Sequence, residues 1–226
     1  GEDAEQALAA LVDEVGAGAT RPRLVELATP GLGKGEPSPK TIGQTVSTLL
    51  PENAIVVDEG ATAGGPTSGM CAVAQPHDWL SLTGGSIGYG LPAAVGAAVA
   101  CPDRKVVCVH GDGGARYTVQ ALWTMARENL DVTVVIFSNR KYQILQVELA
   151  RVGAQTMNKK TLDMLDLTNP SLSFVEMGRG MGVESSLATT AEEFNAQFES
   201  AMNQRGPRLI EAELAHAAAP SVANVI

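Results

Sequence analysis

The residues best suited to chemistry in this 226-residue chain lie directly after two apolar segments. Residues 106–109 run into His-Gly-Asp-Gly-Gly-Ala at 110–115, and residues 132–137 run into Ser-Asn, with the asparagine at 139. Glycines let the backbone turn sharply and approach a ligand, and a helix that starts there offers free N–H groups to phosphate oxygens. Asp112 and Asn139 add the hard oxygen ligands that Mg²⁺ prefers. The pattern indicates a site for Mg²⁺ and a phosphate group.

The Gly-Asp-Gly sequence at 111–113 is weak evidence when taken alone, because Asp-Gly pairs are common in turns. Two other phosphate motifs do not fit the chain. Arg116 stands where a dinucleotide fingerprint needs Gly or Ala, and Gly33-Lys34 is followed by Gly35 instead of Ser or Thr. The sequence therefore favours neither a Rossmann-type nucleotide site nor a P-loop.

Strands and helices are predicted to alternate along most of the chain. Strands that are apolar at nearly every position belong in a parallel sheet covered on both faces, so we expect an α/β fold with a doubly wound, mostly parallel sheet and helices on both faces. Ligands of such sheets bind beyond the carboxyl ends of the strands, where Asp112 and Asn139 stand. The predicted strands are 54–57, 106–109, 132–137 and 208–213, and the predicted helices are 42–50, 91–100, 117–128, 172–181 and 191–202.

The two ends of the chain differ from this pattern. Residues 4–15 have apolar side chains at helical spacing, and residues 19–40 are rich in Gly, Pro and single charges, which predicts a linker. The chain starts at Gly1 without a methionine, so we expect a piece of a longer protein in which residues 1–18 are the last helix of a preceding domain. The main domain is predicted at 41–214, and the tail at 215–226 carries no usable pattern.

Composition narrows the class of partner. A net charge of −9 with scattered basic residues argues against nucleic acid, and no apolar run approaches the roughly 20 residues of a membrane-spanning helix. The three cysteines, Cys71, Cys101 and Cys108, lack metal-ligand spacing and are interpreted as small core residues. We expect a soluble, cytoplasmic protein that binds neither nucleic acid nor membrane.

Three motifs, taken together, resemble the thiamine-diphosphate (ThDP) enzymes, a family that includes acetolactate synthases, pyruvate decarboxylases, benzoylformate decarboxylases and benzaldehyde lyase. The first is Gly-Asp-Gly at 111–113 followed by Asn139. The second is Gly-Gly-Ser-Ile-Gly-Tyr-Gly-Leu-Pro-Ala-Ala at 84–94, and the third is Glu-Gly-Ala-Thr at 59–62. The resemblance covers about 41–214 and implies the family's diphosphate-binding domain, with residues 1–18 ending its central domain.

The resemblance also implies roles for single residues. Mg²⁺ is held by Asp112, Asn139 and the backbone carbonyl of Lys141. The Gly85 carbonyl accepts a bond from the cofactor's 4′-amino group, and Ile87 supports the bent cofactor. Residues directly after the metal loop line the pocket. The implied cofactor-binding set is Thr62, Gly85, Ser86, Ile87, Gly111, Asp112, Gly113, Gly114, Ala115, Asn139, Tyr142, Gln143 and Ile144.

Some positions depart from particular branches of the family. Residues 115–129 are most similar to benzoylformate decarboxylases. Ser138 replaces the first residue of the usual Asn-Asn pair but leaves the ligand Asn139, and Leu145 stands where pyruvate decarboxylases have a glutamate. The Gln-Gly-Met motif of acetolactate synthases is absent after Asn139. We therefore expect a 2-oxo acid decarboxylase or an acyloin-forming carboligase, acting on a small 2-oxo acid or aldehyde.

The family's activating glutamate lies on a pyrimidine-binding domain of the same or a partner chain. Glu26 and Glu59 do not carry its motif and are interpreted as surface or loop-capping residues. We predict no catalytic residue in this chain, no complete catalytic cycle by the chain alone, and a homodimer or homotetramer as the complete form. No catalytic role is expected for His77, His110 or His216. Trp123 and Met125, which follow the motif, are expected in the core.

Three alternatives stay open. The domain could be a non-catalytic binding module, or a separate subunit of a split ThDP enzyme. It could also bind another diphosphate with Mg²⁺, although the segment at 85–87 argues against that. The sequence identifies neither the substrate nor a flavin in the parent protein.

Overall fold

The computed structural model describes residues 3–19, 25–153 and 158–214. The described residues form one six-stranded sheet in the order β2-β1-β3-β4-β6-β5, and every pairing is parallel. The strands are β1 (Ile55–Glu59), β2 (Asp78–Ser81), β3 (Val106–Gly111), β4 (Val132–Ser138), β5 (Glu184–Ala188) and β6 (Arg208–Glu213). The helices are α1 (Ala4–Glu14), α2 (Pro39–Leu49), α3 (Gly64–Cys71), α4 (Gly90–Ala100), α5 (Asp112–Ala115), α6 (Ala121–Arg127), α7 (Gln143–Arg151), α8 (Lys159–Leu165), α9 (Phe174–Gly180) and α10 (Ala191–Met202).

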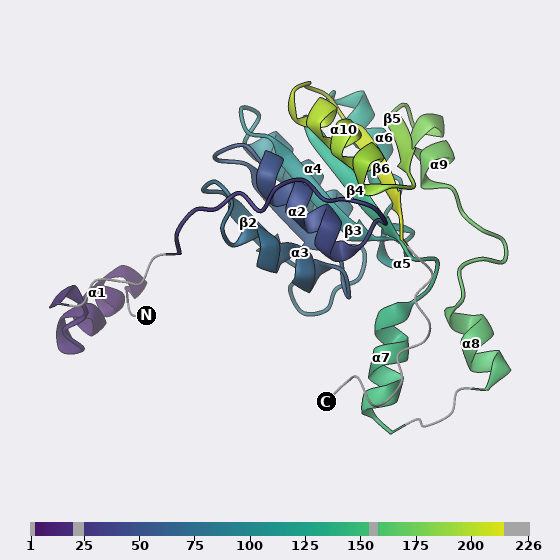
Figure 1. Ribbon diagram of the computed structural model, residues 1–226. Helices are drawn as coiled ribbons and strands as arrows, with labels where there is room; N and C mark the ends of the chain where they lie inside the picture. The colour runs from purple at the N-terminus through teal and green to yellow at the C-terminus, as the bar shows by residue number, and fades with distance from the viewer. Residues whose placement is uncertain (1–2, 20–24, 154–157, 215–226) are drawn as a thin grey trace.

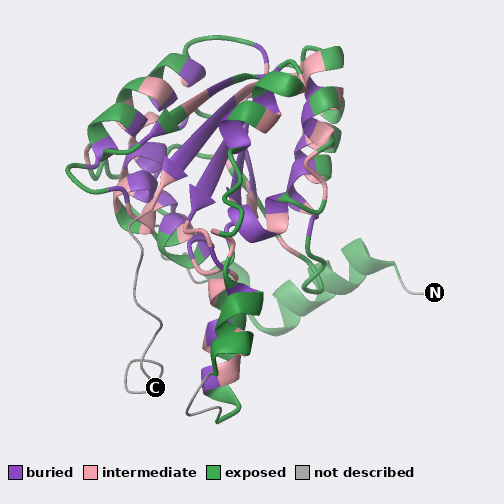
Figure 2. Ribbon diagram, turned by 90° about the vertical axis from the view of Figure 1, so that its right-hand side faces the viewer, coloured by how far each residue is buried: buried purple, intermediate pink, exposed green. Residues whose placement is uncertain are grey.

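Helices cover both faces of the sheet (Figure 1). On one face α2, α3 and α10 pack through residues such as Val46, Cys71 and Phe194. On the other face α4, α6 and α9 pack through residues such as Leu91 and Met125. Successive side chains of a strand point to opposite faces, so each apolar strand supplies both cores. Figure 2 shows the buried strands between helices whose outer surfaces are exposed, and the predicted doubly wound α/β fold is confirmed.

Two strands and several helix ends differ from the sequence-based expectation. β2 and β5 were not predicted, because these edge strands carry exposed polar residues in place of an apolar run. The helix expected at 117–128 is shorter, since a short α5 and a turn precede α6. α2 begins at Pro39, three residues before the predicted start, with a capping box between Ser38 and Thr41.

The N-terminal region has two parts. α1 buries none of its residues, and the short 3-10 helix η1 (Ala17–Ala19) follows it. Within the stretch predicted as a linker, the residues after 27 are hydrogen-bonded to the domain: Ala28 N–H donates to the Val73 carbonyl, and Gly33 N–H donates to Oγ1 of Thr45. This second half therefore lies along the domain. The helix at 4–14 agrees with the predicted one, and its assignment to a preceding domain stays a prediction.

The two ends of the strands differ in character. At the amino edge, Lys105 Nζ lies 2.5 Å from Asp131 and also donates to the carbonyls of Ala201 and Gln204. At the carboxyl edge the chain forms the glycine-rich turns, and α7 extends away from that edge (Figure 1). Among the described residues, no helix is long and apolar enough to cross a membrane.

Candidate functional site

The residues predicted to bind the cofactor gather at the carboxyl edge of the sheet. They follow β2, β1, β3 and β4, which lie side by side in this order in the sheet. Parallel strands end at the same edge, so segments far apart in the sequence meet there. β3 ends at Gly111 and α5 starts at Asp112, while β4 ends at Ser138 and leads into the loop with Asn139. This positioning agrees with the sequence-based expectation.

Asp112 is a buried carboxylate with only 5% of its surface exposed. Its oxygens accept hydrogen bonds from the N–H of Arg140 at 2.6 Å and of Gly113 at 2.8 Å. Burial raises the pKa of Asp112 to about 6; the two N–H donors oppose this rise, and the nearby Glu211 charge adds to it. A bound cation would compensate the buried negative charge.

The loop after β4 fixes the other predicted metal ligands. Oδ1 of Asn139 accepts from Lys141 N–H at 3.1 Å, and Nδ2 donates to Oε1 of Gln143 at 3.0 Å. The Lys141 side chain is buried, and burial lowers its pKa. Arg140 N–H donates to Asp112, so the loop that carries Asn139 and Lys141 is joined directly to the third predicted ligand.

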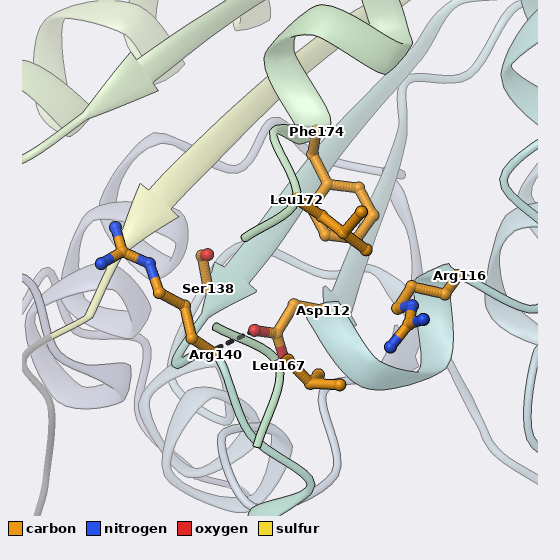
Figure 3. A pocket seen from close by; sticks show the side chains of 7 residues that line it. All are labelled: Asp112, Arg116, Ser138, Arg140, Leu167, Leu172 and Phe174. Carbon is orange, nitrogen blue, oxygen red and sulfur yellow. Dashed lines mark hydrogen bonds between the residues drawn. The ribbon is translucent and has the colours of Figure 1, made fainter. Parts of the chain in front are cut away.

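Figure 3 shows the hollow beside Asp112. The cavity has a volume of about 10 Å³, which is room for roughly one water molecule. Leu167, Leu172 and Phe174 make its wall apolar, and the other lining residues are Asp112, Arg116, Ser138 and Arg140. The described residues contain no group of three or more His, Cys, Asp or Glu side chains that could hold a metal ion. A metal at Asp112 would therefore need amide, carbonyl and ligand oxygens, which is the donor set that suits Mg²⁺.

Two contacts bring the remaining pocket residues together. The ring of Tyr142 lies against Gly113 so closely that a Cβ there would be 2.7 Å from Cδ1 and Cε1. Oγ1 of Thr62 lies 3.5 Å from Oε1 of Gln143, at the limit of a hydrogen bond. Thr62 thus joins the segment after β1 to the loop after β4, although the two are about 80 residues apart in sequence.

The segment at 83–87 is open to solvent. Gly84 and Gly85 have φ angles of +63° and +65°, and a Cβ at either would meet nothing within 4 Å. Ser86 is exposed and the Ile87 side chain is 48% exposed. An exposed large apolar side chain beside open backbone suits a ring-shaped ligand, as the resemblance implies for Gly85 and Ile87. Ile144 is also exposed, at 40%.

Glu59 differs from the sequence-based interpretation. It is 5% exposed, so a surface role is wrong, while loop capping is correct: its oxygens accept from the N–H of Gly88 at 2.6 Å and of Gly90 at 2.5 Å. Nε2 of the fully buried His110 lies 3.0 Å from Oε2 of Glu59. Burial would raise the pKa of Glu59, but the adjacent His110 and the two N–H donors outweigh it and lower the pKa.

The other residues considered in the sequence analysis differ in how far they are buried. Met125 is fully buried as expected, but Trp123 is 54% exposed, with Arg127 5.3 Å from its ring centroid, so its placement in the core was wrong. Glu26 is exposed, and the partly buried His77 contacts the carbonyl of Gln75. Cys71 and Cys108 are buried and Cys101 is partly buried. His216 lies outside the described residues.

A comparison with known families supports this assignment. Residues 64–212 match the model of the thiamine pyrophosphate enzyme, C-terminal TPP binding domain. The chain belongs to this family. Thiamine pyrophosphate is the same molecule as ThDP, so the prediction of ThDP is confirmed, while Mg²⁺ stays a prediction. The domain is the ThDP-binding C-terminal domain of acetolactate synthase-like and benzoylformate decarboxylase-like enzymes.

Individual relatives agree with the family. The chain is 50% identical over 209 residues to the provisionally named acetolactate synthase large subunit IlvX of Mycobacterium tuberculosis, a match of 92% of this chain and 40% of the relative. It is 33% identical over 190 residues to benzoylformate decarboxylase of Pseudomonas aeruginosa, covering 84% of this chain and 34% of the relative. The chain thus spans less than half the length of these relatives.

A solved structure shows the same fold. The ThDP-dependent 4-hydroxybenzoylformate decarboxylase of Rhodococcus jostii RHA1 superposes with a TM-score of 0.69 at 28% identity, over 87% of this chain and 36% of that chain. Benzoylformate decarboxylase of Polynucleobacter necessarius superposes with a TM-score of 0.67, and at 24% identity it supports the fold alone.

Proposed function

We propose that this domain binds the diphosphate of ThDP through Mg²⁺ held by Asp112, Asn139 and the Lys141 carbonyl. The observation that carries the proposal is the burial of Asp112. A buried ionised carboxylate is costly unless it is paired or coordinates a metal. Two backbone N–H groups donate to Asp112, but burial still raises its pKa to about 6, so these two hydrogen bonds do not fully offset the cost of burying the charge.

Different residues are proposed to bind the diphosphate, the metal and the ring end of the cofactor. Gly114 has no side chain at the start of α5, so its N–H group can approach a phosphate oxygen, while the Gly113 N–H donates to Asp112. The amide oxygen of Asn139 is oriented by the N–H of Lys141, in the loop after β4 that carries the proposed metal ligands. Gly85 and Ile87 bind the ring end of the cofactor. When bound, ThDP supplies the electron sink for carbanion chemistry at the carbonyl carbon of the substrate.

We further propose that the complete protein is a 2-oxo acid decarboxylase or an acyloin-forming carboligase. Its activating glutamate would lie on a pyrimidine-binding domain, in the same or a partner chain, and the complete form would be a homodimer or homotetramer. The length of the relatives supports this proposal, since the chain spans 40% of one and 34% of another. The substrate is a small 2-oxo acid or aldehyde, and this chain alone is inactive.

The first experiment is calorimetric titration of the chain with ThDP, with and without Mg²⁺. The expected result is binding that requires Mg²⁺ and is lost in Asp112→Asn. The matched control is Asp103→Asn, because Asp103 is exposed at the amino edge of the sheet. ThDP binding by Asp112→Asn with an unchanged Mg²⁺ requirement would contradict the ligand assignment.

Two further measurements separate this proposal from a split enzyme and from a non-catalytic module. A subunit of a split enzyme would bind ThDP tightly only after addition of a separate pyrimidine-binding chain. A non-catalytic module would bind ThDP in its complete form without turning over any 2-oxo acid. Decarboxylation of benzoylformate or pyruvate by the complete protein, measured as released CO₂, would exclude that module.

A further inference from the structure

The carboxylate of Glu59 connects both halves of the proposed cofactor site. Glu59 ends β1 and His110 stands opposite it on β3, in direct register. Both side chains are buried, at 5% and 0% exposure. Two charged or polar groups at this depth need compensating partners, and Glu59 finds them in two backbone N–H groups and the His110 ring.

Glu59 holds the segment that leads out of the open loop at 83–87. Its Oε1 accepts from Gly88 N–H and its Oε2 from Gly90 N–H. Gly88 has a φ of +86°, and a Cβ on it would meet Tyr117 and Thr118 within 3.2 Å. Both glycines are buried, whereas residues 83–87 are exposed. The carboxylate therefore anchors the open loop at the point where it enters the domain.

The same pair also contacts the diphosphate motif. A Cβ on Gly90 would lie 2.7 Å from the His110 ring and 3.1 Å from Glu59 Cβ. A Cβ on Gly114 would lie 2.9 Å from Oε1 of Glu59 and 2.9 Å from Cε1 of His110. The motif at 111–114 and the segment at 88–90 thus both pack against the buried pair of Glu59 and His110.

We propose that Glu59 is a positioning residue that sets the backbone of residues 84–87 for the aminopyrimidine ring, through its bonds to Gly88 and Gly90. This inference rests on the proposed function. Both oxygens of Glu59 accept from N–H groups of the chain, so its assigned role is to hold this segment. The hydrogen bonds of Glu59 go to the segment at the ring end of the site and not to Asp112, Asn139 or Lys141.

The test compares two ligands that differ in the part of the site they need. ThDP needs both the metal loop and the segment at 84–87, whereas inorganic pyrophosphate with Mg²⁺ needs only the metal loop and the start of α5. In Glu59→Gln one carboxylate oxygen becomes an amide N–H₂ that faces a backbone N–H. The expected result, by calorimetry on the full chain, is ThDP binding weakened at least tenfold with pyrophosphate binding changed less than twofold.

A second buried carboxylate provides the control. Glu211 is also 5% exposed, and it accepts from the N–H of Phe174 and Val175. It lies close enough to Asp112 to raise the pKa of that carboxyl. Glu211→Gln should therefore change the affinities for ThDP and pyrophosphate by the same factor, as a general effect on the metal loop or on stability would.

Amide hydrogen exchange on the ligand-free chain gives an independent readout. Glu59→Gln should speed exchange at Gly88 and Gly90 while the central amides of β3 and β4 keep their protection. Unchanged exchange at the two glycines, or equal weakening of both ligands, would overturn the role of Glu59. If the wild-type chain binds neither ligand, the proposed function fails for the isolated chain, and the exchange result alone decides whether Glu59 holds this segment.

Discussion

The side-chain amide of Asn139 is held at both ends, with Nδ2 donating to Oε1 of Gln143 at 3.0 Å. The other end is unambiguous, because Oδ1 faces the N–H of Lys141, which can only donate. Gln143 must therefore present its oxygen to Asn139, and a flipped Asn139 would place two N–H groups against each other. Gln143 fixes which atom of Asn139 can reach a metal.

Removing this partner should weaken the metal site. In Gln143→Ala the Asn139 amide loses its acceptor, and loss of such an outer partner typically weakens metal binding by about tenfold or more. The measurement is the Mg²⁺ concentration needed for half-maximal ThDP binding. Gln143→Glu retains an acceptor and should stay close to wild type, and the exposed Gln120→Ala serves as control. Equal Mg²⁺ requirements in Gln143→Ala and wild type would contradict the role of Gln143.

Adding a methyl group at Gly113 should disturb both packing and binding. The new Cβ would lie 2.7 Å from the Tyr142 ring, so the ring must move or the α5 turn must shift. Overpacking of this kind costs about 1–3 kcal/mol. Urea unfolding should show that loss in Gly113→Ala. The double variant Gly113→Ala/Tyr142→Ala should recover part of it, and strictly additive losses would show that the ring is not the obstacle.

Glu59 should stabilise the fold in a pH-dependent way. Its pKa is lower in the folded protein than its ordinary value of 4.5, so its contribution is complete above pH 4.5 and is lost as the pH falls through the lower, folded-state pKa. The difference in unfolding free energy between wild type and Glu59→Gln should be about 1–3 kcal/mol at pH 7. It should shrink in strong acid, where the protonated glutamate resembles glutamine. A difference that does not change with pH would show that shape alone, not charge, is responsible.

The cysteines should differ in reactivity. Burial raises the pKa of the Cys71 thiol to about 12 and also raises that of Cys108, and only the thiolate attacks thiol reagents. Cys101 is partly exposed. A thiol-reactive dye at pH 7.5 should label Cys101 first, as peptide mapping would show, and label the other two only in denaturant. Fast labelling of Cys108 in the native protein would mean that β3 is accessible.

The sequence predicted the centre of the sheet better than its edges. β1, β3, β4 and β6 are covered on both faces. β3 and β4 are apolar at most positions, and β1 and β6 contain shorter apolar stretches, so all four can be recognised without a structure. β2 and β5 lie at the edges, where residues such as Glu184 face solvent, and they show no such run. The helix α3 carries three glycines among its eight residues, so its local preference is poor and its packing against α2 is what makes it helical.

Within the site, the residues that a motif identifies lie where the sequence predicts. The contact between Glu59 and His110, which belong to no single motif, was not predicted. Asp112 and Asn139 follow apolar strands and belong to a motif, so they can be found when the motif and the strand ends are taken together. The pairing of Glu59 with His110 joins residues about 50 positions apart, and it becomes visible only once the register of β1 against β3 is known. An alignment of those two predicted strands by their glycine-rich ends would have placed the two side chains opposite each other.

The contrast between the two ends of the sheet has a practical consequence for measuring binding. All segments proposed to contact the cofactor leave the carboxyl edge, while the amino edge is closed by ion pairs such as Lys105 with Asp131. The turn at Pro102 and Asp103 is exposed at that amino edge. A biotin-acceptor peptide inserted in this turn would let the protein be immobilised on a sensor chip with its binding edge turned toward the flowing solution.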